Sequence, residues 1–335
     1  MGLLHEPGPD PRAVSGAKAL GGAKAPGGAE ASGGSKAVSG VQAPGSVVFL
    51  GAGPGAPDLL TLRGHKLLSE ADLVVYAGSL VNPALLSFCR PDCEILDSAV
   101  MTLPEVLKAL IRAAGEGKRV VRLHTGDPSV YGAIREQMDG LRKAGVPFSV
   151  CPGVSSFSAA AAAIPAEYTL PGVSQTVILS RAEGRTEVPE KEQLELLAAH
   201  QASLVLFLSA GQLETVSRRL ISGGYPPDTP AALVYKASWP EEQVVRATLE
   251  KLPEAGRRAG ITRTALILVG GFLGENYALS KLYSPAFETG YRKRTSAPAG
   301  EGGRPEAQVQ EVKAQEVQVQ EVKAQEVPGS REEST

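Results

Sequence analysis

The chain has 335 residues, a formal net charge of -2 at pH 7 and 43% hydrophobic residues. A charge this close to zero gives no reason to expect a nucleic acid as partner. No apolar run is long enough to span a membrane and no signal core opens the chain, so we expect a cytoplasmic protein without a membrane partner. The three cysteines lack the spacing of a zinc site, and we expect no bound metal.

Both ends of the chain differ in composition from its middle. Residues 1–46 are rich in Gly, Ala, Ser, Pro and Lys, and residues 295–335 repeat Gln-Glu-Val with a five-residue period that fits neither a helix nor a strand. We expect a disordered low-complexity tail at 1–46 and a disordered repeat tail at 295–335, because neither segment carries the side chains of a core.

The segment 47–164 alternates short apolar runs with amphipathic patterns, which is typical of parallel strands joined by helices. It predicts an N-terminal α/β domain with a parallel sheet. The predicted strands are 47–51, 73–76, 94–96, 119–123 and 147–151, and the predicted helices are 58–69, 82–88, 102–115 and 129–144.

Prolines and a glycine break the pattern after a helix of small residues at 158–163, so we place a linker at 165–172. A C-terminal α/β domain is predicted at 173–294. Its strands are expected at 175–180, 203–208, 231–235, 243–248 and 265–269, with helices at 190–199 and 211–222. No helix separates the third and fourth of these strands, so this sheet is predicted to be mixed.

The loop 51–61 joins the first strand to the first helix. Its glycines allow close backbone approach to a ligand, and it matches the dinucleotide pattern G-x-G-x-x-A. A nucleotide site also needs an acidic residue at the end of the second strand, whereas Asp72 precedes that strand. Pro54 and Pro57 remove N–H donors that a pyrophosphate would use. The loop is therefore predicted to form the wall of a cofactor site and not to bind phosphate groups.

A second loop should reach the same edge of the sheet, where ligands of open α/β sheets bind. The turn 124–132 follows the fourth strand and contains Asp127, which is either a helix N-cap or a functional residue. His124 is interpreted as a packed residue rather than a base. In the second half, the charged loop 180–189 is either solvated or binds an anionic substrate.

These motifs, taken in order, resemble the tetrapyrrole methylases, and most closely their precorrin-4 and cobalt-precorrin-4 C11-methyltransferase branch. The family motifs are 51–61 (GAGPGAPDLLT), 76–80 (YAGSL), 126–132 (GDPSVYG), 152–156 (PGVSS) and 206–209 (LFLS). The branch motifs are 76–81 (YAGSLV), 170–179 (LPGVSQTVIL), 181–186 (RAEGRT) and 237–240 (ASWP). The resemblance spans about 47–294 and leaves both tails outside it.

The resemblance implies a homodimeric two-domain α/β enzyme of cobalamin (vitamin B12) and porphyrin biosynthesis that binds S-adenosylmethionine in the cleft between its domains. Carried over by position, the cofactor-binding residues are Pro54, Gly126, Asp127, Ser155, Ser156, Phe207, Leu208, Ala232, Thr264, Ala265 and Leu266. If any side chain assists proton loss, Asp127 is the candidate catalytic residue. The tetrapyrrole substrate carries many carboxylates, so Arg181, Arg185 and Lys236 are the candidate substrate-binding residues.

Three other functions stay open from the sequence. One is a methylase acting on another corrin or uroporphyrinogen carbon. A second is an NAD-dependent oxidoreductase using the glycine pattern, which the position of Asp72 disfavours. The third is a non-catalytic binding protein, which the ordered set of motifs disfavours.

Overall fold

The computed structural model describes residues 42–294, and the two predicted tails lie outside these residues except for 42–46. Gln42 is buried, and its amide donates hydrogen bonds to the carbonyl oxygens of Ser46 (2.7 Å) and Val120 (2.9 Å). Gln42 therefore contacts the first sheet from a position a few residues before the first predicted strand.

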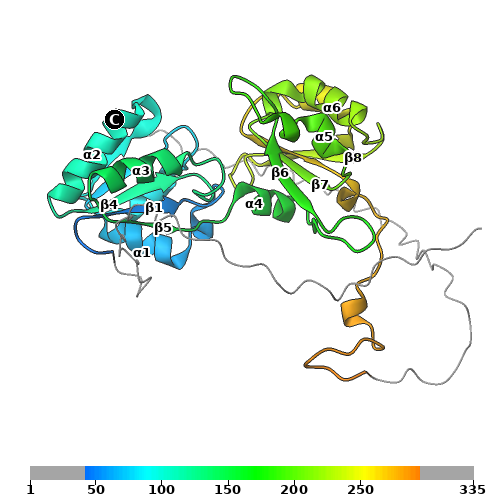
Figure 1. Cartoon of the computed structure of the whole chain (residues 1–335), viewed down its shortest axis with the longest axis horizontal. Coiled ribbons are helices and arrows are strands. Elements are labelled where there is room, and N and C mark those ends of the chain that lie inside the picture. Colours follow the sequence, from blue (N-terminus) through cyan, green and yellow to red (C-terminus); the bar gives the residue numbers. More distant parts are fainter. Residues whose placement is uncertain (1–41, 295–335) are drawn as a thin grey trace, which may run out of the picture. The chain divides into compact units, whose positions relative to one another are not determined.

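Five parallel strands form the first sheet, in the spatial order β3-β2-β4-β1-β5. They are β1 (Ser46–Gly51), β2 (Leu73–Tyr76), β3 (Glu94–Asp97), β4 (Arg119–His124) and β5 (Phe148–Cys151). Figure 1 shows α2 (Leu103–Gly115) and α3 (Ile134–Lys143) over one face, and α1 (Leu62–Glu70) covers the other. The predicted parallel sheet is confirmed, with strand ends that differ from the prediction by one residue at most.

The helices that follow β1 and β4 pack on opposite faces of this sheet, although the two strands are neighbours. The loops after these strands stay paired at Gly53 and Gly126 and separate beyond these residues, where the helices turn to opposite faces. In open α/β sheets such a switch in direction leaves a crevice in which ligands bind.

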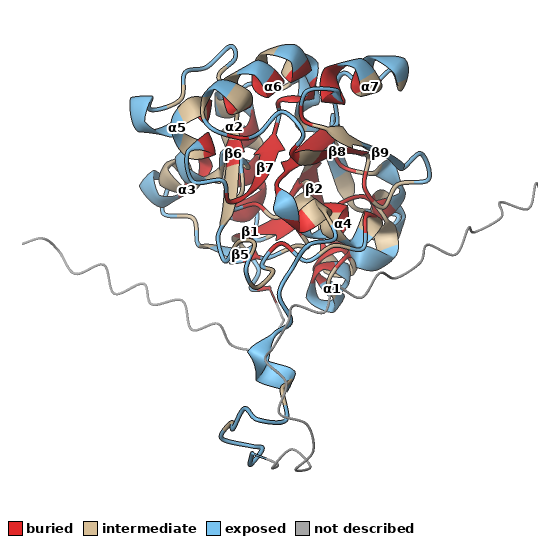
Figure 2. Ribbon diagram, turned by 90° about the vertical axis from the view of Figure 1, so that its right-hand side faces the viewer, coloured by how far each residue is buried: buried red, intermediate tan, exposed pale blue. Residues whose placement is uncertain are grey.

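The second sheet has the order β6-β7-β10-β8-β9. Its strands are β6 (Val177–Arg181), β7 (Ser203–Phe207), β8 (Pro230–Tyr235), β9 (Gln243–Thr248) and β10 (Ala265–Val269). Only β6 and β7 pair in parallel, while β10 runs antiparallel to β7 and β8, and β8 runs antiparallel to β9. The predicted mixed sheet is confirmed. Figure 2 shows buried strands in both sheets beneath helices whose outer faces are exposed.

One face of the second sheet is covered by α5 (Leu194–Ala198), α6 (Leu213–Ser222) and α7 (Leu252–Arg258). The other face packs against α4 (Ser156–Ala163), because Ala159 and Ala160 share a core with Val205 and Leu268. Helix α4 thus lies in the core of the second sheet although it precedes 165–172 in the chain. A domain boundary at 165–172 stays a prediction.

Helix starts are where the structure departs most from the predicted elements. The helix expected from 58 begins at Leu62, after a 3₁₀ turn (Pro57–Leu59) and the N-cap Thr61. The helix expected from 129 begins at Ile134, because Tyr131 and Ala133 adopt positive φ values that an α-helix cannot contain. Segment 83–88 is a 3₁₀ helix, and α7 was not predicted.

The described residues up to Ala278 form one compact unit, and a second unit begins at Leu279. Within the second unit, Arg292 donates hydrogen bonds to the carbonyl oxygens of Leu282 (2.7 Å) and Ser284 (2.8 Å), which closes a loop. Across residues 42–294 no helix is both long and apolar enough to cross a bilayer.

Candidate active site

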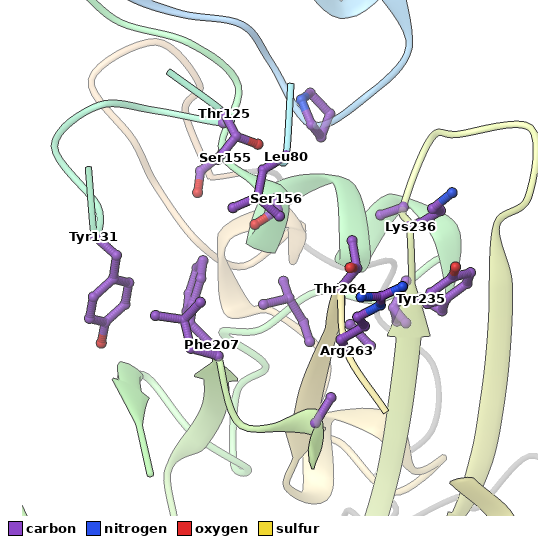
Figure 3. A pocket seen from close by; sticks show the side chains of 18 of the residues that line it. Leu80, Thr125, Tyr131, Ser155, Ser156, Phe207, Tyr235, Lys236, Arg263 and Thr264 are labelled. Carbon is purple, nitrogen blue, oxygen red and sulfur yellow. The ribbon is translucent and has the colours of Figure 1, made fainter. Parts of the chain in front are cut away.

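A cavity of about 1070 Å³ lies between the carboxyl edge of the first sheet and the loops of the second. Loops after β1, β4 and β5 line one side, and loops around β7, β8 and β10 line the other (Figure 3). A cavity is therefore present where the sequence analysis expected the cleft. The lining includes these predicted site residues: Pro54, Gly126, Asp127, Ser155, Ser156, Arg185, Phe207, Leu208, Lys236, Thr264, Ala265 and Leu266.

Four glycines bring the backbones of the first sheet's loops into direct contact. A Cβ atom on Gly153 would lie 2.2 Å from the carbonyl oxygen of Gly126 and 2.8 Å from Gly51. Gly53 and Gly126 exchange backbone hydrogen bonds of 2.8 and 3.3 Å. This edge of the cavity is thus a wall of closely packed backbone, as the glycine loop had indicated.

The carboxylate of Asp127 holds two of these loops together. Its Oδ1 accepts a hydrogen bond from the N–H of Ser129 (2.9 Å) and another from the Ser129 hydroxyl, and its Oδ2 accepts from the N–H of Gly153 (3.0 Å). Burial raises the pKa of Asp127, but these hydrogen bonds outweigh it and hold the pKa below its ordinary value. A carboxylate so well satisfied is a poor proton acceptor, and the geometry gives Asp127 a positioning role.

Backbone strain concentrates around the cavity. Among the described residues, eight that are not glycine have positive φ, and Tyr131, Leu208, Lys236 and Thr264 are four of them that line the cavity. Such conformations each cost about 1–3 kcal/mol and persist only where the surroundings fix them. Their concentration here makes the cavity the candidate functional site.

The cavity offers both apolar and polar surface to a ligand. Leu208 is 67% exposed, and the rings of Tyr131 and Phe207 lie 5.2 Å apart on one side (Figure 3). In the part of the chain that the structure describes, the hydroxyls of Thr125, Ser155, Ser156 and Thr264 line the cavity and make no hydrogen bond. An apolar floor with free hydroxyls fits a cofactor such as S-adenosylmethionine, which has an adenine ring and a polar ribose and amino acid group.

Three cationic side chains also line the cavity, Arg185, Lys236 and Arg263. Lys236 lies 3.3 Å from the carboxylate of Glu241, whereas neither arginine has a hydrogen bond or ion pair within residues 42–294. Figure 3 shows Arg263 beside Thr264 among the side chains that line the cavity. The sequence analysis missed Arg263, and only its position two residues before the start of β10 could have signalled it.

Two predicted site residues do not line the cavity. The guanidinium of Arg181 donates to the carbonyl oxygens of Thr186 (3.1 Å) and Glu187 (2.6 Å), so it braces its own loop. Ala232 is fully buried in the core between the second sheet and α4.

His124 is buried at the end of β4, as interpreted from the sequence, and its Nε2 atom has no hydrogen-bond partner among the described residues. Burial and the nearby charge of Arg122 lower its pKa to about 3. The imidazole is therefore neutral at pH 7 and packs against Phe49, with 6.1 Å between ring centroids.

Asp72, which the oxidoreductase hypothesis would need at the cofactor, lies elsewhere. Its carboxylate accepts hydrogen bonds from Arg90 (2.7 Å) and from the N–H of Arg119 (2.8 Å), at the start of β4. Strand β2 ends at Tyr76 instead of an acidic residue. The structure thus lacks the ribose-binding carboxylate of a dinucleotide site at that position.

Comparison with known proteins places this architecture in one family. The sequence profile described as Tetrapyrrole (Corrin/Porphyrin) Methylases matches residues 46–253. The chain is 51% identical over 248 residues to the cobalt-precorrin-4 C(11)-methyltransferase of Methanocaldococcus jannaschii, which covers 74% of this chain and 96% of that protein.

Solved structures agree with the sequence match. The X-ray structure of a cobalamin biosynthetic enzyme, cobalt precorrin-4 methyltransferase, is 48% identical with a TM-score of 0.68, covering 69% of this chain and 97% of that one. Uroporphyrin-III C-methyl transferase from Thermus thermophilus, complexed with S-adenyl homocysteine, is 30% identical with a TM-score of 0.57. The match covers 68% of this chain and 93% of that one.

Proposed function

The chain belongs to the tetrapyrrole methylase family, and from that premise we propose that it transfers a methyl group from S-adenosylmethionine to C11 of precorrin-4 or cobalt-precorrin-4, a step of cobalamin biosynthesis. The observation that carries this proposal is the cavity itself. One side of the cavity is a wall of closely packed backbone with free hydroxyls, which suits a polar cofactor. Its rim carries arginines that have no ion pair among the described residues, which suits a reactant with several negative charges. At about 1070 Å³ it exceeds the range of roughly 300–1,000 Å³ typical for a single drug-sized ligand.

For the cofactor we propose the residues that wall the cavity. The backbone of Pro54 and Gly126 and the hydroxyls of Ser155, Ser156 and Thr264 would hold its polar groups. Phe207, Leu208, Ala265 and Leu266 would contact its adenine, and Asp127 would fix the loops around it. Ala232 lies behind this layer and would act through packing only.

The bound cofactor supplies a sulfonium that makes its methyl group a reactive electrophile. The chain's own contribution is to hold the acceptor carbon in line with that methyl group and to exclude water, and correct placement of two reactants can lower a barrier by roughly 7–11 kcal/mol. Because the hydrogen bonds to Asp127 keep its pKa low, we assign it no proton transfer.

For the substrate we propose that its carboxylates meet Arg185, Lys236 and Arg263. Arginine suits this task because its planar fork matches a carboxylate in two hydrogen bonds. Arg181 would keep the loop that presents Arg185 in shape, since its guanidinium already bonds to loop carbonyls.

The proposed activity is tested by incubating the purified chain with precorrin-4 or cobalt-precorrin-4 and methyl-labelled S-adenosylmethionine. We expect one labelled methyl group per ring, located at C11 by NMR. Label on another ring carbon would favour a different methylase of the same family, and no transfer to any tetrapyrrole would reject the methylase function.

We further propose that the protein works as a homodimer in the cytoplasm, and the resemblance to the precorrin-4 branch supports both statements. Light scattering coupled to gel filtration measures the mass directly. A mass of twice 34.8 kDa is expected, and a monomer would contradict the proposal.

A further inference from the structure

The turn between β8 and β9 carries Trp239, the only tryptophan of the chain, and reaches across the cavity to the glycine loop after β1. The indole N–H of Trp239 donates a hydrogen bond of 2.9 Å to the carbonyl oxygen of Pro54. The neighbouring Ser238 hydroxyl accepts a hydrogen bond of 3.0 Å from the N–H of Ala56. Two side chains of the second sheet therefore hold two residues of a loop that belongs to the first.

Within the glycine loop, 51–61, backbone hydrogen bonds begin only at Ala56, whose carbonyl oxygen accepts from the N–H of Leu59 (3.1 Å). Prolines at 54 and 57 remove two N–H donors, and the carbonyl oxygen of Gly55 is taken by the side-chain amide of Asn82 (2.9 Å). Side chains from outside the loop thus bond to three consecutive residues, Pro54, Gly55 and Ala56.

The indole also lies directly against the loop. A Cβ atom on Gly55 would lie 2.0 Å from Cδ1 of Trp239. The indole can therefore pack against the loop only because residue 55 has no side chain. Since Pro54 and Trp239 both line the cavity, their contact sets the shape of the cavity wall.

The turn itself is strained and fixed from several sides. Lys236 and Ser238 have φ values of 45° and 69°. Two bonds hold this conformation: the N–H of Lys236 donates to the carbonyl oxygen of Thr264 (3.0 Å), and the N–H of Ser238 donates to the carboxylate of Glu242 (2.6 Å). The ammonium of Lys236 lies 5.0 Å from the indole centroid, within cation–π distance. Strain maintained in this way is characteristic of functional sites.

We propose that Trp239 is a positioning residue for the methyl transfer: it fixes the Pro54–Ala56 segment in the conformation that binds the cofactor and holds Lys236 at the cavity rim. Trp239 takes no part in bond making. This inference rests on the proposed function, because it concerns the cofactor of that same site.

The test compares Trp239→Phe, which keeps an aromatic ring but loses the N–H, with Trp239→Leu, which loses both. Calorimetry with S-adenosylhomocysteine should show a Kd raised about fivefold in Trp239→Phe, the size expected for one hydrogen bond. Trp239→Leu should raise it further, and it alone should also raise the KM for the tetrapyrrole, because Lys236 loses the nearer of its two aromatic partners, Trp239 (5.0 Å) and Tyr235 (5.7 Å). Gln243→Ala, an exposed position at the start of β9, is the matched control.

Gly55→Ala provides a second, independent test of this proposal. In the wild-type background its new methyl group displaces the indole and should weaken cofactor binding. In the Trp239→Leu background, where the indole is gone, the same substitution should change the Kd much less. Equal effects of Gly55→Ala in both backgrounds would overturn the proposal.

The sole tryptophan also reports binding without any substitution. Titration of the wild-type chain with S-adenosylhomocysteine should change its tryptophan emission along the calorimetric isotherm. If the wild type binds the ligand but Trp239→Phe binds it equally well, Trp239 is not a positioning residue and the proposed function stands. If the wild type neither binds the ligand nor methylates a tetrapyrrole, both proposals fall.

Discussion

The carboxylate of Asp127 accepts a hydrogen bond of 3.0 Å from the backbone N–H of Gly153, and this bond ties the loop after β4 to the loop after β5. Both loops line the cavity, through Gly126 on one side and Ser155 on the other. One carboxylate oxygen thus fixes the distance between two walls of the site, while its partner oxygen caps the turn at Ser129.

Replacement of Asp127 by Asn should destabilise the fold. The amide has one oxygen for the three hydrogen bonds that the carboxylate accepts, so at least one N–H loses its partner. We expect a loss of about 1–3 kcal/mol in the free energy of unfolding at pH 7, measured by urea denaturation. Ser129→Ala removes only the hydroxyl donor and should cost less, and an unchanged denaturation midpoint in Asp127→Asn would contradict the assignment.

The same substitution predicts a pH dependence. The folded pKa of Asp127 lies below its ordinary value of 3.8, so the carboxylate stabilises the fold fully above that value and loses its contribution as the pH falls through the folded pKa. The stability difference between wild type and Asp127→Asn should be constant at neutral pH and shrink below about pH 4. A difference that persists unchanged in strong acid would argue against these hydrogen bonds.

His124 predicts a second and separate pH window. Its pKa is lowered from 6.5 to about 3, so between these values the unfolded chain binds a proton that the folded chain excludes. Stability should therefore fall as the pH drops below about 6.5, and this slope should disappear in His124→Gln. His200→Gln, at an exposed position, is the control for the loss of a histidine side chain. An identical slope in His124→Gln would show that the imidazole is accessible to protons.

Gly153→Ala should disrupt the site through the backbone. Its Cβ atom would lie 2.2 Å from the carbonyl oxygen of Gly126, and the backbone of one loop must move. Overpacking of this kind costs typically 1–3 kcal/mol, and we expect a lower melting temperature together with weaker cofactor binding. Gly115→Ala, at the end of α2 with no atom within 4 Å of the new Cβ, is the control and should not destabilise the fold.

Much of the fold could be predicted because its strands are short apolar runs with clear ends. The predicted strand 243–248 coincides with β9, and β10 was also predicted to the residue. The start of α3 was wrong because Tyr131 and Ala133 take conformations that only their tertiary surroundings enforce. Helix α7 was missed even though Pro253 and Glu254 in its first turn are helix-start signals.

The candidate site, too, could be predicted from the sequence only in part. Glycines that allow close backbone approach are visible in a sequence, and the walls that they build were predicted. Which arginine of one loop faces the cavity is not visible, because it depends on where the loop carbonyls point. Arg181 bonds to those carbonyls and Arg185 does not. Arg263 sits in a short polar connection without periodicity, so no pattern distinguished it from a solvated residue.

The two unpaired arginines give the last prediction. If Arg185 and Arg263 bind substrate carboxylates, replacing either with Ala should raise the tetrapyrrole KM by at least about tenfold, since hydrogen bonds to charged groups contribute about 1.5–3 kcal/mol. The Kd for S-adenosylhomocysteine should stay unchanged, because neither guanidinium belongs to the proposed cofactor wall. Arg→Lys should restore part of the loss, since it keeps the charge but not the fork.

Arg181→Ala is expected to behave differently, because its guanidinium holds the loop and not the ligand. It should lower the melting temperature and kcat together, and Arg181→Lys should recover little, since one ammonium cannot replace bonds to two carbonyl groups. Arg135→Ala, on an arginine side chain of α3 that is 81% exposed, controls for the general loss of a positive charge. Wild-type kinetics in both Arg185→Ala and Arg263→Ala would remove these arginines from the substrate site. A raised cofactor Kd in Arg263→Ala alone would instead move that residue to the cofactor wall beside Thr264.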